Sequence, residues 1–160
     1  MFDERQTMAF TVYLAGEIHS EWRDAVRALA ERAGLEVEFT SPVTDHAVSD
    51  EAAERTIGHA LLGEEPTGWV KDHASAKINA IRTRHHIRTA DAVVVRFAGQ
   101  YREWNAAMDA GQAVALGKPL IVLHDPELTH ALKEVDAAAL AVAQTPEQVV
   151  KVLEYVLVQR

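Results

Sequence analysis

The sequence contains no cysteine. This absence excludes disulfide bonds, a thiolate nucleophile, cysteine-ligated zinc and iron–sulfur clusters. Long hydrophobic runs are also missing, since no apolar stretch approaches the roughly 18–20 residues that a membrane-spanning helix needs. The N-terminal stretch MFDERQTMAF carries acidic residues and lacks the apolar core of a signal peptide. We therefore expect a cytoplasmic protein with no membrane partner.

Positive charge is scarce: 16 lysines and arginines stand against 24 aspartates and glutamates, which gives a net charge of −8. A protein that binds a nucleic acid polymer needs basic groups to neutralise phosphates, so this balance argues against such a partner. A single nucleotide needs only a local site and is compatible with the charge. With 160 residues, 48% of them hydrophobic, the chain can form one domain with its own core. We expect a flexible lead over residues 1–8 and one domain over residues 9–160.

Short apolar runs alternate with amphipathic stretches along the chain. The apolar runs predict strands over residues 9–15, 35–39, 92–97, 120–123 and 140–143. The amphipathic stretches predict helices over residues 21–33, 51–62, 75–89, 102–116 and 145–157. This alternation indicates an α/β fold, a flavodoxin-like three-layer sandwich whose five-stranded parallel sheet has the order 2-1-3-4-5. Ligands bind such sheets at the carboxyl ends of the strands where the winding reverses, which brings loops 15–20 and 97–104 together.

The first candidate site follows the first predicted strand. Gly16 allows the backbone to approach a ligand closely, and the start of the next helix offers free N–H groups to an anion. His19, Ser20 and Arg23 would complete a phosphate or hydroxyl site there. The alternative is that Ser20 only caps the helix and that Arg23 is solvated. Neither a GxGxxG nor a P-loop motif supports a dinucleotide or triphosphate site.

The second candidate site lies on the predicted helix over residues 102–116. Asn105, Asp109 and Gln112 fall on one face of this helix, among alanines and a glycine. An aspartate in such a helix is a poor helix former and is unfavourable when buried, which indicates a functional reason for Asp109. The alternative is an exposed ladder of hydrogen bonds between the three polar side chains.

Further polar residues lie between the second and third predicted strands. The histidines and aspartates of this segment raise the possibility of a metal-dependent hydrolase that uses His46, Asp50 and His73, but their spacing matches no metal motif such as HExxH. Farther along, Asn79, Arg82 and Thr83 share one face of the helix that enters the third strand. Arg82 is suited to hold a carboxylate or phosphate with two hydrogen bonds, or to pair with Asp109. A plain surface arginine is the alternative.

Four segments carry a resemblance to a known family. They are YLAGEIHSEWR (13–23), SPVTDHAVSDEAAERTIG (41–58), KDHASAKINAIRTRHHIRTADAVVV (71–95) and YREWNAAMDAGQAVALGKPLIV (101–122). Together they resemble the YtoQ family, which is related to the nucleoside 2-deoxyribosyltransferases. In the wider superfamily a glutamate in an E-L-G-x-A helix attacks the anomeric carbon. The matching stretch here is D-A-G-Q-A (109–113), so the resemblance places the nucleophile on Asp109 and the superfamily's base-recognising aspartate on Thr83. It also implies a homo-oligomer.

The resulting hypothesis is an enzyme that hydrolyses or transfers the N-glycosidic bond of a nucleoside, nucleotide or related ribosyl compound through a carboxylate nucleophile. The residues assigned to catalysis are Asp109, Asn105 and Glu17. The residues assigned to substrate binding are Tyr13, Gly16, His19, Ser20, Arg23, Asn79, Arg82, Thr83 and Trp104. Glu17 or His19 would protonate the departing base, and neither a metal nor an organic cofactor is expected. The alternative is a module that binds a nucleotide or metabolite without cleaving it.

Overall fold

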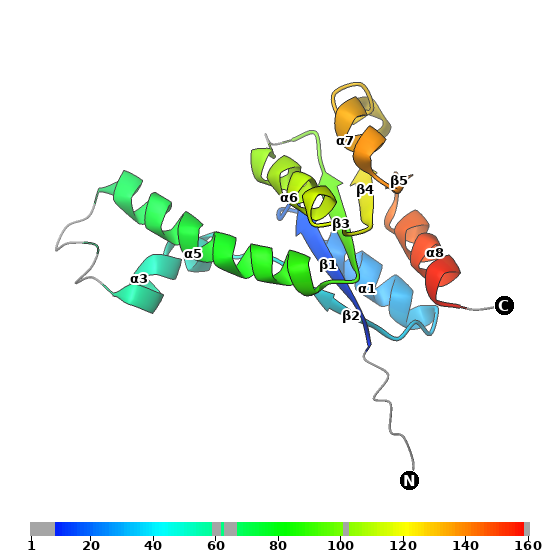
Figure 1. The fold of residues 1–160 in the computed structure, drawn as a ribbon, viewed down its shortest axis with the longest axis horizontal. Helices are drawn as coiled ribbons and strands as arrows, with labels where there is room; N and C mark the ends of the chain where they lie inside the picture. Colours follow the sequence, from blue (N-terminus) through cyan, green and yellow to red (C-terminus); the bar gives the residue numbers. More distant parts are fainter. Residues whose placement is uncertain (1–8, 59–61, 63–66, 101–102, 159–160) are drawn as a thin grey trace, which may run out of the picture.

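The computed structural model describes residues 9–58, 62, 67–100 and 103–158. Its centre is a parallel sheet of five strands in the order β2-β1-β3-β4-β5 (Figure 1). The strands are β1 (Phe10–Gly16), β2 (Val37–Thr40), β3 (Ala92–Phe97), β4 (Leu120–His124) and β5 (Ala141–Ala143). The predicted α/β class and the strand order 2-1-3-4-5 are thereby confirmed.

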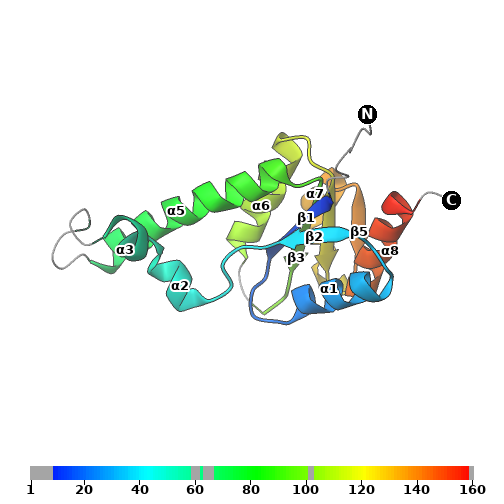
Figure 2. The same cartoon turned by 90° about the horizontal axis from the view of Figure 1, so that it is seen from below.

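Helices cover both faces of this sheet (Figures 1 and 2). One face packs against α1 (Trp22–Arg32) and α8 (Pro146–Leu157), and the other against α5 (Gly68–Thr89), α6 (Trp104–Ala115) and α7 (Lys133–Ala138). The central strands are apolar at almost every position because both of their faces are buried. Along β3, Val94 belongs to the core under α1 and α8, whereas Val93 and Val95 belong to the core under α5 and α6.

An arm extends from the sheet and consists of α2 (His46–Asp50), α3 (Ala52–Ile57) and the N-terminal half of α5. Figures 1 and 2 show this arm projecting sideways beyond the strands. The buried hydroxyl of Ser75 fastens it, because it donates to the carbonyl of Asp50 at 2.6 Å and accepts from the N–H of Ala53 at 3.1 Å. The Asn79 amide donates to the Ser49 carbonyl and hydroxyl, both at 3.0 Å.

Three predictions about the helices were wrong. The helix predicted over residues 75–89 begins at Gly68, because the arm gives its first turns a packing partner that the sequence pattern does not show. Within the range predicted as a helix over residues 51–62, α3 ends at Ile57, and residues 59–61 lie outside the described residues. The helix α2, which precedes it, was not predicted. Between β4 and β5 the sequence predicted no helix, yet the structure has the 3₁₀-helix η1 (Pro126–Leu128) and α7.

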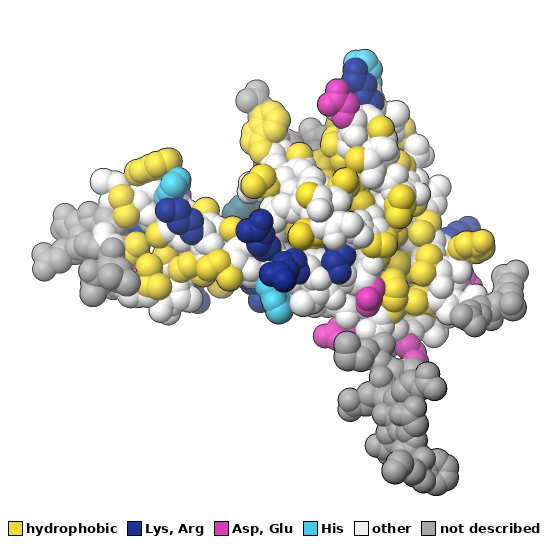
Figure 3. Space-filling view, viewed as in Figure 1, with side chains coloured by type: hydrophobic (Ala, Val, Ile, Leu, Met, Phe, Trp, Pro, Cys, Tyr) yellow, Lys and Arg dark blue, Asp and Glu magenta, His cyan; other side chains and the backbone are white. Residues whose placement is uncertain are grey.

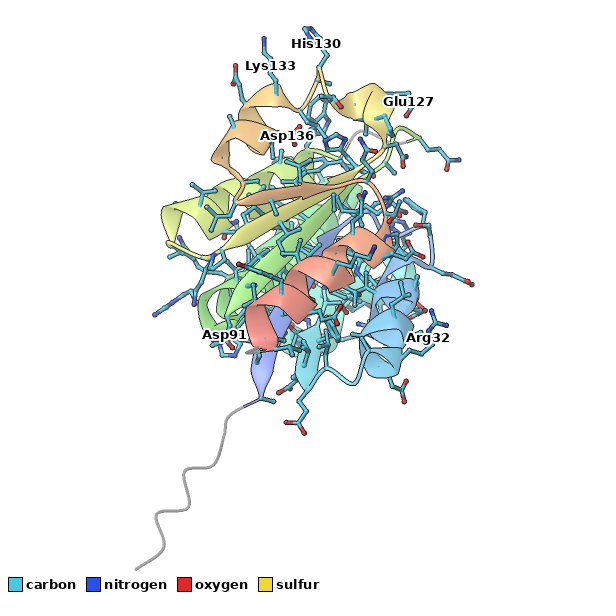
Figure 4. The ribbon with its side chains drawn as sticks, turned by 90° about the vertical axis from the view of Figure 1, so that its right-hand side faces the viewer. Arg32, Asp91, Glu127, His130, Lys133 and Asp136 are labelled. Atoms are coloured by element: carbon cyan, nitrogen blue, oxygen red, sulfur yellow. The ribbon has the colours of Figure 1, made fainter. Side chains whose placement is uncertain are left out.

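A polar contact joins α7 to the sheet, beside the apolar packing of Val135 on the core. His124 is buried at the end of β4, its Nδ1 lies 2.7 Å from the carbonyl oxygen of Asp125, and its Nε2 lies 3.1 Å from a carboxylate oxygen of Asp136. Figure 4 shows Asp136 between α7 and the sheet, whereas Glu127, His130 and Lys133 project outward. In the part of the chain that the structure describes, no helix is long and apolar enough to cross a membrane.

Gly16 is the position where the fold tolerates no side chain, and a substitution there tests the packing of β1 on β3. Its φ is +98°, and a Cβ atom would lie 2.1 Å from the carbonyl oxygen of Arg96. We predict that Gly16→Ala lowers the free energy of unfolding by more than about 2 kcal/mol, measured by chemical denaturation. The matched control is Gly111→Ala in α6, where a Cβ meets nothing within 4 Å. That variant gains up to about 1 kcal/mol from helix propensity. Equal stability of the two variants would contradict this packing.

Candidate active site

The β1–α1 turn brings the end of β1 directly against β3. Gly16 pairs in register with Arg96, and the backbone N–H of Glu17 donates to the Arg96 carbonyl at 3.1 Å. This turn stands at the point where the sheet winding reverses, between β1 and β3. Side chains from the turn therefore meet those that follow β3 and those of α6.

Arg23 fixes the shape of this turn. Its guanidinium donates from Nε to the Leu14 carbonyl at 2.9 Å, from Nη1 to the Glu17 carbonyl at 2.5 Å and from Nη2 to the Gly16 carbonyl at 3.0 Å. Arg23 is buried, and this burial lowers the pKa of its guanidinium to about 10. The alternative of a solvated Arg23 was therefore wrong. Every guanidinium nitrogen serves a backbone carbonyl, so we assign Arg23 to positioning the turn rather than to holding a phosphate.

The Glu17 side chain folds back onto its own loop. Its carboxylate accepts hydrogen bonds from the backbone N–H of His19 and, at 2.5 Å, from the hydroxyl of Ser20. The alternative that Ser20 only caps the helix was wrong, because the capping position of α1 is Glu21 and no side chain caps the helix. The hydroxyl instead serves the buried Glu17 carboxylate, which draws His19 and Ser20 into one compact loop.

Tyr13 stands under this loop on the face of the sheet covered by α5 and α6. It is fully buried, its hydroxyl donates to the Thr83 hydroxyl at 3.5 Å, and its ring stacks on His86 with a centroid separation of 5.7 Å. Burial raises the pKa of Tyr13 to about 12, and the nearby charge of Asp109 acts in the same direction. The phenol is therefore neutral and lies close enough to Asp109 to feel its charge.

Asp109 lies in the second turn of α6, on the side that faces the sheet. The small residues Ala106, Ala110 and Ala113 are buried and let the helix approach β3 and β1 closely. Burial raises the pKa of Asp109 to about 7, and the positive charge of Arg23 opposes this rise. Asn105 is exposed whereas Asp109 is partly buried, so the two do not share a fully solvated face as the ladder alternative required.

The other predicted residues lie around this centre. Arg82 is exposed and donates to the Ser41 carbonyl at 3.2 Å, while Asn79 is engaged with Ser49 in the arm. His19 is exposed and stacks on His46 across a centroid separation of 5.2 Å, which connects the turn to the start of α2. Trp104 is 73% exposed at the first turn of α6. The fold thus brings together Tyr13, Thr83 and Asp109. It leaves Asn79 and Trp104 outside this group.

The residues proposed for a metal hydrolase do not gather. His46 stacks on His19, whereas the His73 ring lies tilted against Trp69 at a centroid separation of 4.4 Å. Within residues 9–58, 62, 67–100 and 103–158, no group of three or more histidines, aspartates and glutamates is placed to hold a metal ion. The described residues therefore do not support the hypothesis of a metal-dependent hydrolase.

Two residues near the site were missed by sequence reasoning. Glu103 precedes α6 and accepts a hydrogen bond from the Ala98 N–H at 2.8 Å, and burial raises the pKa of its carboxyl. Arg96 is the penultimate residue of β3, among apolar residues, and pairs with Asp125 at 3.4 Å. Both lie at the carboxyl end of β3, and this position was the signal that could have found them: a charged residue inside a buried strand and a carboxylate at a helix start.

A family model matches most of the chain. The model described as Nucleoside 2-deoxyribosyltransferase YtoQ matches residues 13–157. The chain is also 39% identical over 148 residues to the uncharacterized protein YtoQ of Bacillus subtilis (strain 168), and the match covers 92% of this chain and 97% of that protein.

Solved structures share the fold at low sequence identity. A 2-deoxyribosyltransferase from Bacillus psychrosaccharolyticus has a TM-score of 0.52 at 18% identity, covering 87% of this chain and 89% of that one. The Clostridium botulinum CMP N-glycosidase BcmB has a TM-score of 0.51 at 14% identity, covering 92% and 99%. A conserved protein from Enterococcus faecalis V583 has a TM-score of 0.62 at 14% identity, covering 94% and 100%. The structures show a shared fold, and the family model together with the Bacillus subtilis relative shows that this chain belongs to the YtoQ family of nucleoside 2-deoxyribosyltransferase-like proteins.

Proposed function

We propose that this protein cleaves or transfers the N-glycosidic bond of a nucleoside or a related ribosyl compound, with Asp109 as the nucleophile. The observation that carries the proposal is the setting of Asp109. It is a partly buried carboxyl group with a pKa near 7, beside the neutral Tyr13 hydroxyl, where the sheet winding reverses. Carboxyl groups with raised pKa values cluster at catalytic sites. The 2-deoxyribosyltransferase and the N-glycosidase that share the fold act on the same kind of bond.

The proposed reaction has two steps. An oxygen of the ionised Asp109 carboxylate forms a bond to the anomeric carbon of the sugar, the bond from that carbon to the base nitrogen breaks, and its electron pair leaves with the base. A proton must then reach the departing base. In the second step a water molecule or an acceptor base attacks the anomeric carbon and releases Asp109. Hydrolysis and transfer differ only in this second nucleophile.

The residues around Asp109 are assigned to holding the loop, donating a proton and contacting the substrate. Glu17 already accepts two hydrogen bonds as a carboxylate, so we assign it to holding the loop, and we assign proton donation to His19 on the same loop. Tyr13, neutral below a pH of about 12, keeps a hydroxyl next to Asp109. Thr83, which accepts from Tyr13 at 3.5 Å, and the exposed Arg82 would line the substrate side. Asn105 and Trp104 would meet the substrate at the exposed start of α6.

We also propose that the chain forms a homo-oligomer. The large side chains of Trp69 and Ile81 on α5 are 70% and 72% exposed, and Met108 on α6 is 66% exposed. Figure 3 shows hydrophobic side chains spread over the arm and over α6. An apolar groove of about 330 Å³ between α6 and α7, lined by residues such as Ala107 and Val114, adds to this exposed surface. Exposed apolar surface of this kind is typical of protein interfaces.

Replacement of Asp109 tests the proposed reaction. We predict that Asp109→Asn and Asp109→Ala release free base from nucleosides at a rate lower by a factor on the order of a thousand, because the nucleophile is lost. Activity of the wild type should rise as the pH increases through about 7, since only the ionised Asp109 attacks. The measurement is base release by chromatography across ribo- and deoxyribonucleosides.

The matched control for that experiment is Asp24→Asn, which changes an exposed aspartate that pairs with Arg27 on α1. It should retain wild-type activity. Equal base release by wild type and Asp109→Asn would refute the proposed nucleophile. A ligand that the wild type binds and leaves intact by mass spectrometry would instead favour a binding module.

The raised pKa of Asp109 also predicts a pH dependence of stability. The folded pKa of about 7 lies above the value of 3.8 expected in the unfolded chain. The group therefore contributes its stability below about pH 4, and this contribution is lost as the pH rises through 7. We predict that Asp109→Asn melts at least about 3 °C above the wild type at pH 8 and gains much less at pH 4. A melting-temperature difference that does not change with pH would contradict the raised pKa.

The oligomer is tested by molar mass in solution. We predict that light scattering coupled to size-exclusion chromatography finds a multiple of the chain mass. The double variant Trp69→Ser and Ile81→Ser should shift the population toward the monomer, because it removes exposed apolar area from α5. The control is Tyr155→Ser, which changes a side chain that is 88% exposed on α8. A wild type that is monomeric at high micromolar concentration would contradict the proposal.

A further inference from the structure

One side of α5 carries a straight row of exposed side chains, and we refer to it as the α5 row. Its members are Val70, Lys77, Ile81, Arg84 and Arg88. Successive members are seven, four, three and four residues apart, the heptad spacing that keeps side chains on one side of a helix. All five are exposed, Ile81 by 72%, whereas Ser75 and Ile87, the buried residues of the same helix, lie off this row. The row therefore faces away from the strands.

The charge of this part of α5 is opposite to that of the rest of the chain. Residues 73–90 contain 4 lysines and arginines and no aspartate or glutamate, whereas the remaining residues contain 12 against 24. Figure 3 shows lysine and arginine side chains gathered over α5. Among the residues that the structure describes, none forms an ion pair with Lys77, Arg84 or Arg88. Three unpaired cations in line with an exposed isoleucine are typical of a surface that meets an acidic partner.

A surface of the opposite charge lies at the edge of the sheet. A groove of about 530 Å³ runs between the end of α1 and the edge strand β2, and we refer to it as the β2 groove. Leu35 and Phe39 line it together with the exposed residues Glu31 and Glu36. Neither glutamate has an ion-pair partner in the described part of the chain, and the cation of the groove, Arg27, already pairs with an aspartate of α1 at 3.0 Å. The groove therefore presents unpaired carboxylates beside apolar side chains.

The two surfaces are complementary in charge and in chemistry. In the α5 row, Lys77 and Arg84 flank Ile81 by about one helical turn on each side. In the β2 groove, two carboxylates accompany two apolar side chains. Because α1 and α5 pack on opposite faces of the sheet, these surfaces face different directions and cannot meet within one chain (Figures 1 and 2). A second copy of the chain brings them together.

We propose that the α5 row of one copy docks into the β2 groove of a second copy, so that the copies associate through unlike surfaces. The proposal rests on the homo-oligomer proposed above and assigns its interface. Ile81 packs on the apolar side chains of the groove, and Lys77 and Arg84 pair with its two glutamates. A contact between unlike surfaces closes into a ring when its rotation allows and otherwise extends into a chain of copies.

The order of side chains in the α5 row favours a protein partner over other anionic partners. A helix that lies on a membrane has a broad apolar face with its cations on the opposite, polar face. In the α5 row, Lys77, Arg84 and Arg88 stand in line with Ile81, so no broad apolar face remains. A nucleic acid polymer is disfavoured by the net charge of −8. The heptad spacing and the mixture of cations with an apolar residue fit a groove between secondary-structure elements of a protein.

Charge reversal tests the docking of the two surfaces. The double variant Lys77→Glu with Arg84→Glu makes the row acidic, and the double variant Glu31→Lys with Glu36→Lys makes the groove basic. Each variant alone should self-associate at least about tenfold more weakly than the wild type, because like charges then face each other. An equimolar mixture of the two should associate again, since the acidic row of one variant meets the basic groove of the other. The measurement is sedimentation velocity over a concentration series at low salt.

Two further double variants control for the change in net charge. Lys133→Glu with Lys151→Glu, and Glu127→Lys with Glu154→Lys, change exposed residues outside both surfaces. They should associate as the wild type does. Each variant is first shown to melt within a few degrees of the wild type. Where a reversed variant fails to fold, glutamine at the same two positions replaces it and should also weaken association, because the paired charges are lost.

The outcomes separate the docking from the oligomer itself. Association of either surface variant at the strength of the wild type, or a mixture that fails to associate again, would overturn the docking and leave the oligomer in place. Wild-type sedimentation with phosphatidylserine vesicles that is lost in the Lys77→Glu, Arg84→Glu variant, with unchanged self-association, would assign the row to a lipid surface and overturn the docking. A wild type that stays monomeric at every concentration would contradict both proposals. None of these outcomes depends on base release, so the proposed reaction is tested separately.

Discussion

Three hydrogen bonds from the buried guanidinium of Arg23 hold the part of the chain on which the candidate site depends. They satisfy the carbonyls of Leu14, Gly16 and Glu17, which lie beyond Tyr13, the last residue of β1 in register with β2. The same contacts press the turn against β3, where only a glycine fits. Breaking one such bond leaves a buried carbonyl unsatisfied, which destabilises a protein by about 1–3 kcal/mol. The geometry of Glu17, His19 and Ser20 follows from this one side chain.

The second constraint is the close approach of α6 to the sheet. Alanines at the buried positions of α6 bring the helix backbone near β1 and β3, and this approach removes Asp109 from water. The raised pKa of Asp109 is thus a consequence of small neighbours and not of a nearby negative charge. Ionisation of a partly buried carboxyl group is unfavourable. The presence of Asp109 on the inner side of α6 is therefore a feature that folding alone does not explain.

Much of the fold could be predicted from local pattern, because the strands are short apolar runs and the helices carry clear periodicity. β3 and α6 show this best, since each is followed by a glycine, Gly99 after β3 and Gly117 after α6. The helix α7 was missed because it is short and places only Val135 and Ala139 near its end against the core, while its polar contact joins Asp136 to His124 of β4. The first turns of α5 were missed because they depend on α2 and α3, which lie elsewhere in the sequence.

The site was predicted unevenly for the same reason. Asp109 and Tyr13 stand out in the sequence by their neighbours or their match to a motif, whereas the tasks of Arg23 and Arg96 depend on contacts between separate segments. Arg23 reads as a surface residue of an amphipathic helix, and only the folded turn shows that its guanidinium is buried. Glu103 precedes a helix in the sequence, and only the fold shows that its carboxylate accepts a hydrogen bond from the Ala98 N–H at the end of β3.

The most direct test of the account is the capture of the covalent intermediate. Fluorine at the 2-position of the sugar slows both steps of glycosyl transfer by destabilising the positively charged transition state, and with a good leaving base it allows the glycosyl-enzyme to accumulate. Intact-protein mass spectrometry after incubation with 2-deoxy-2-fluoro nucleosides would measure the adduct. The account predicts a mass increase of one fluorinated sugar, located by peptide mapping on Asp109 and absent from the Asp109→Asn protein. An adduct on another residue, or turnover of ordinary nucleosides with no adduct, would contradict it.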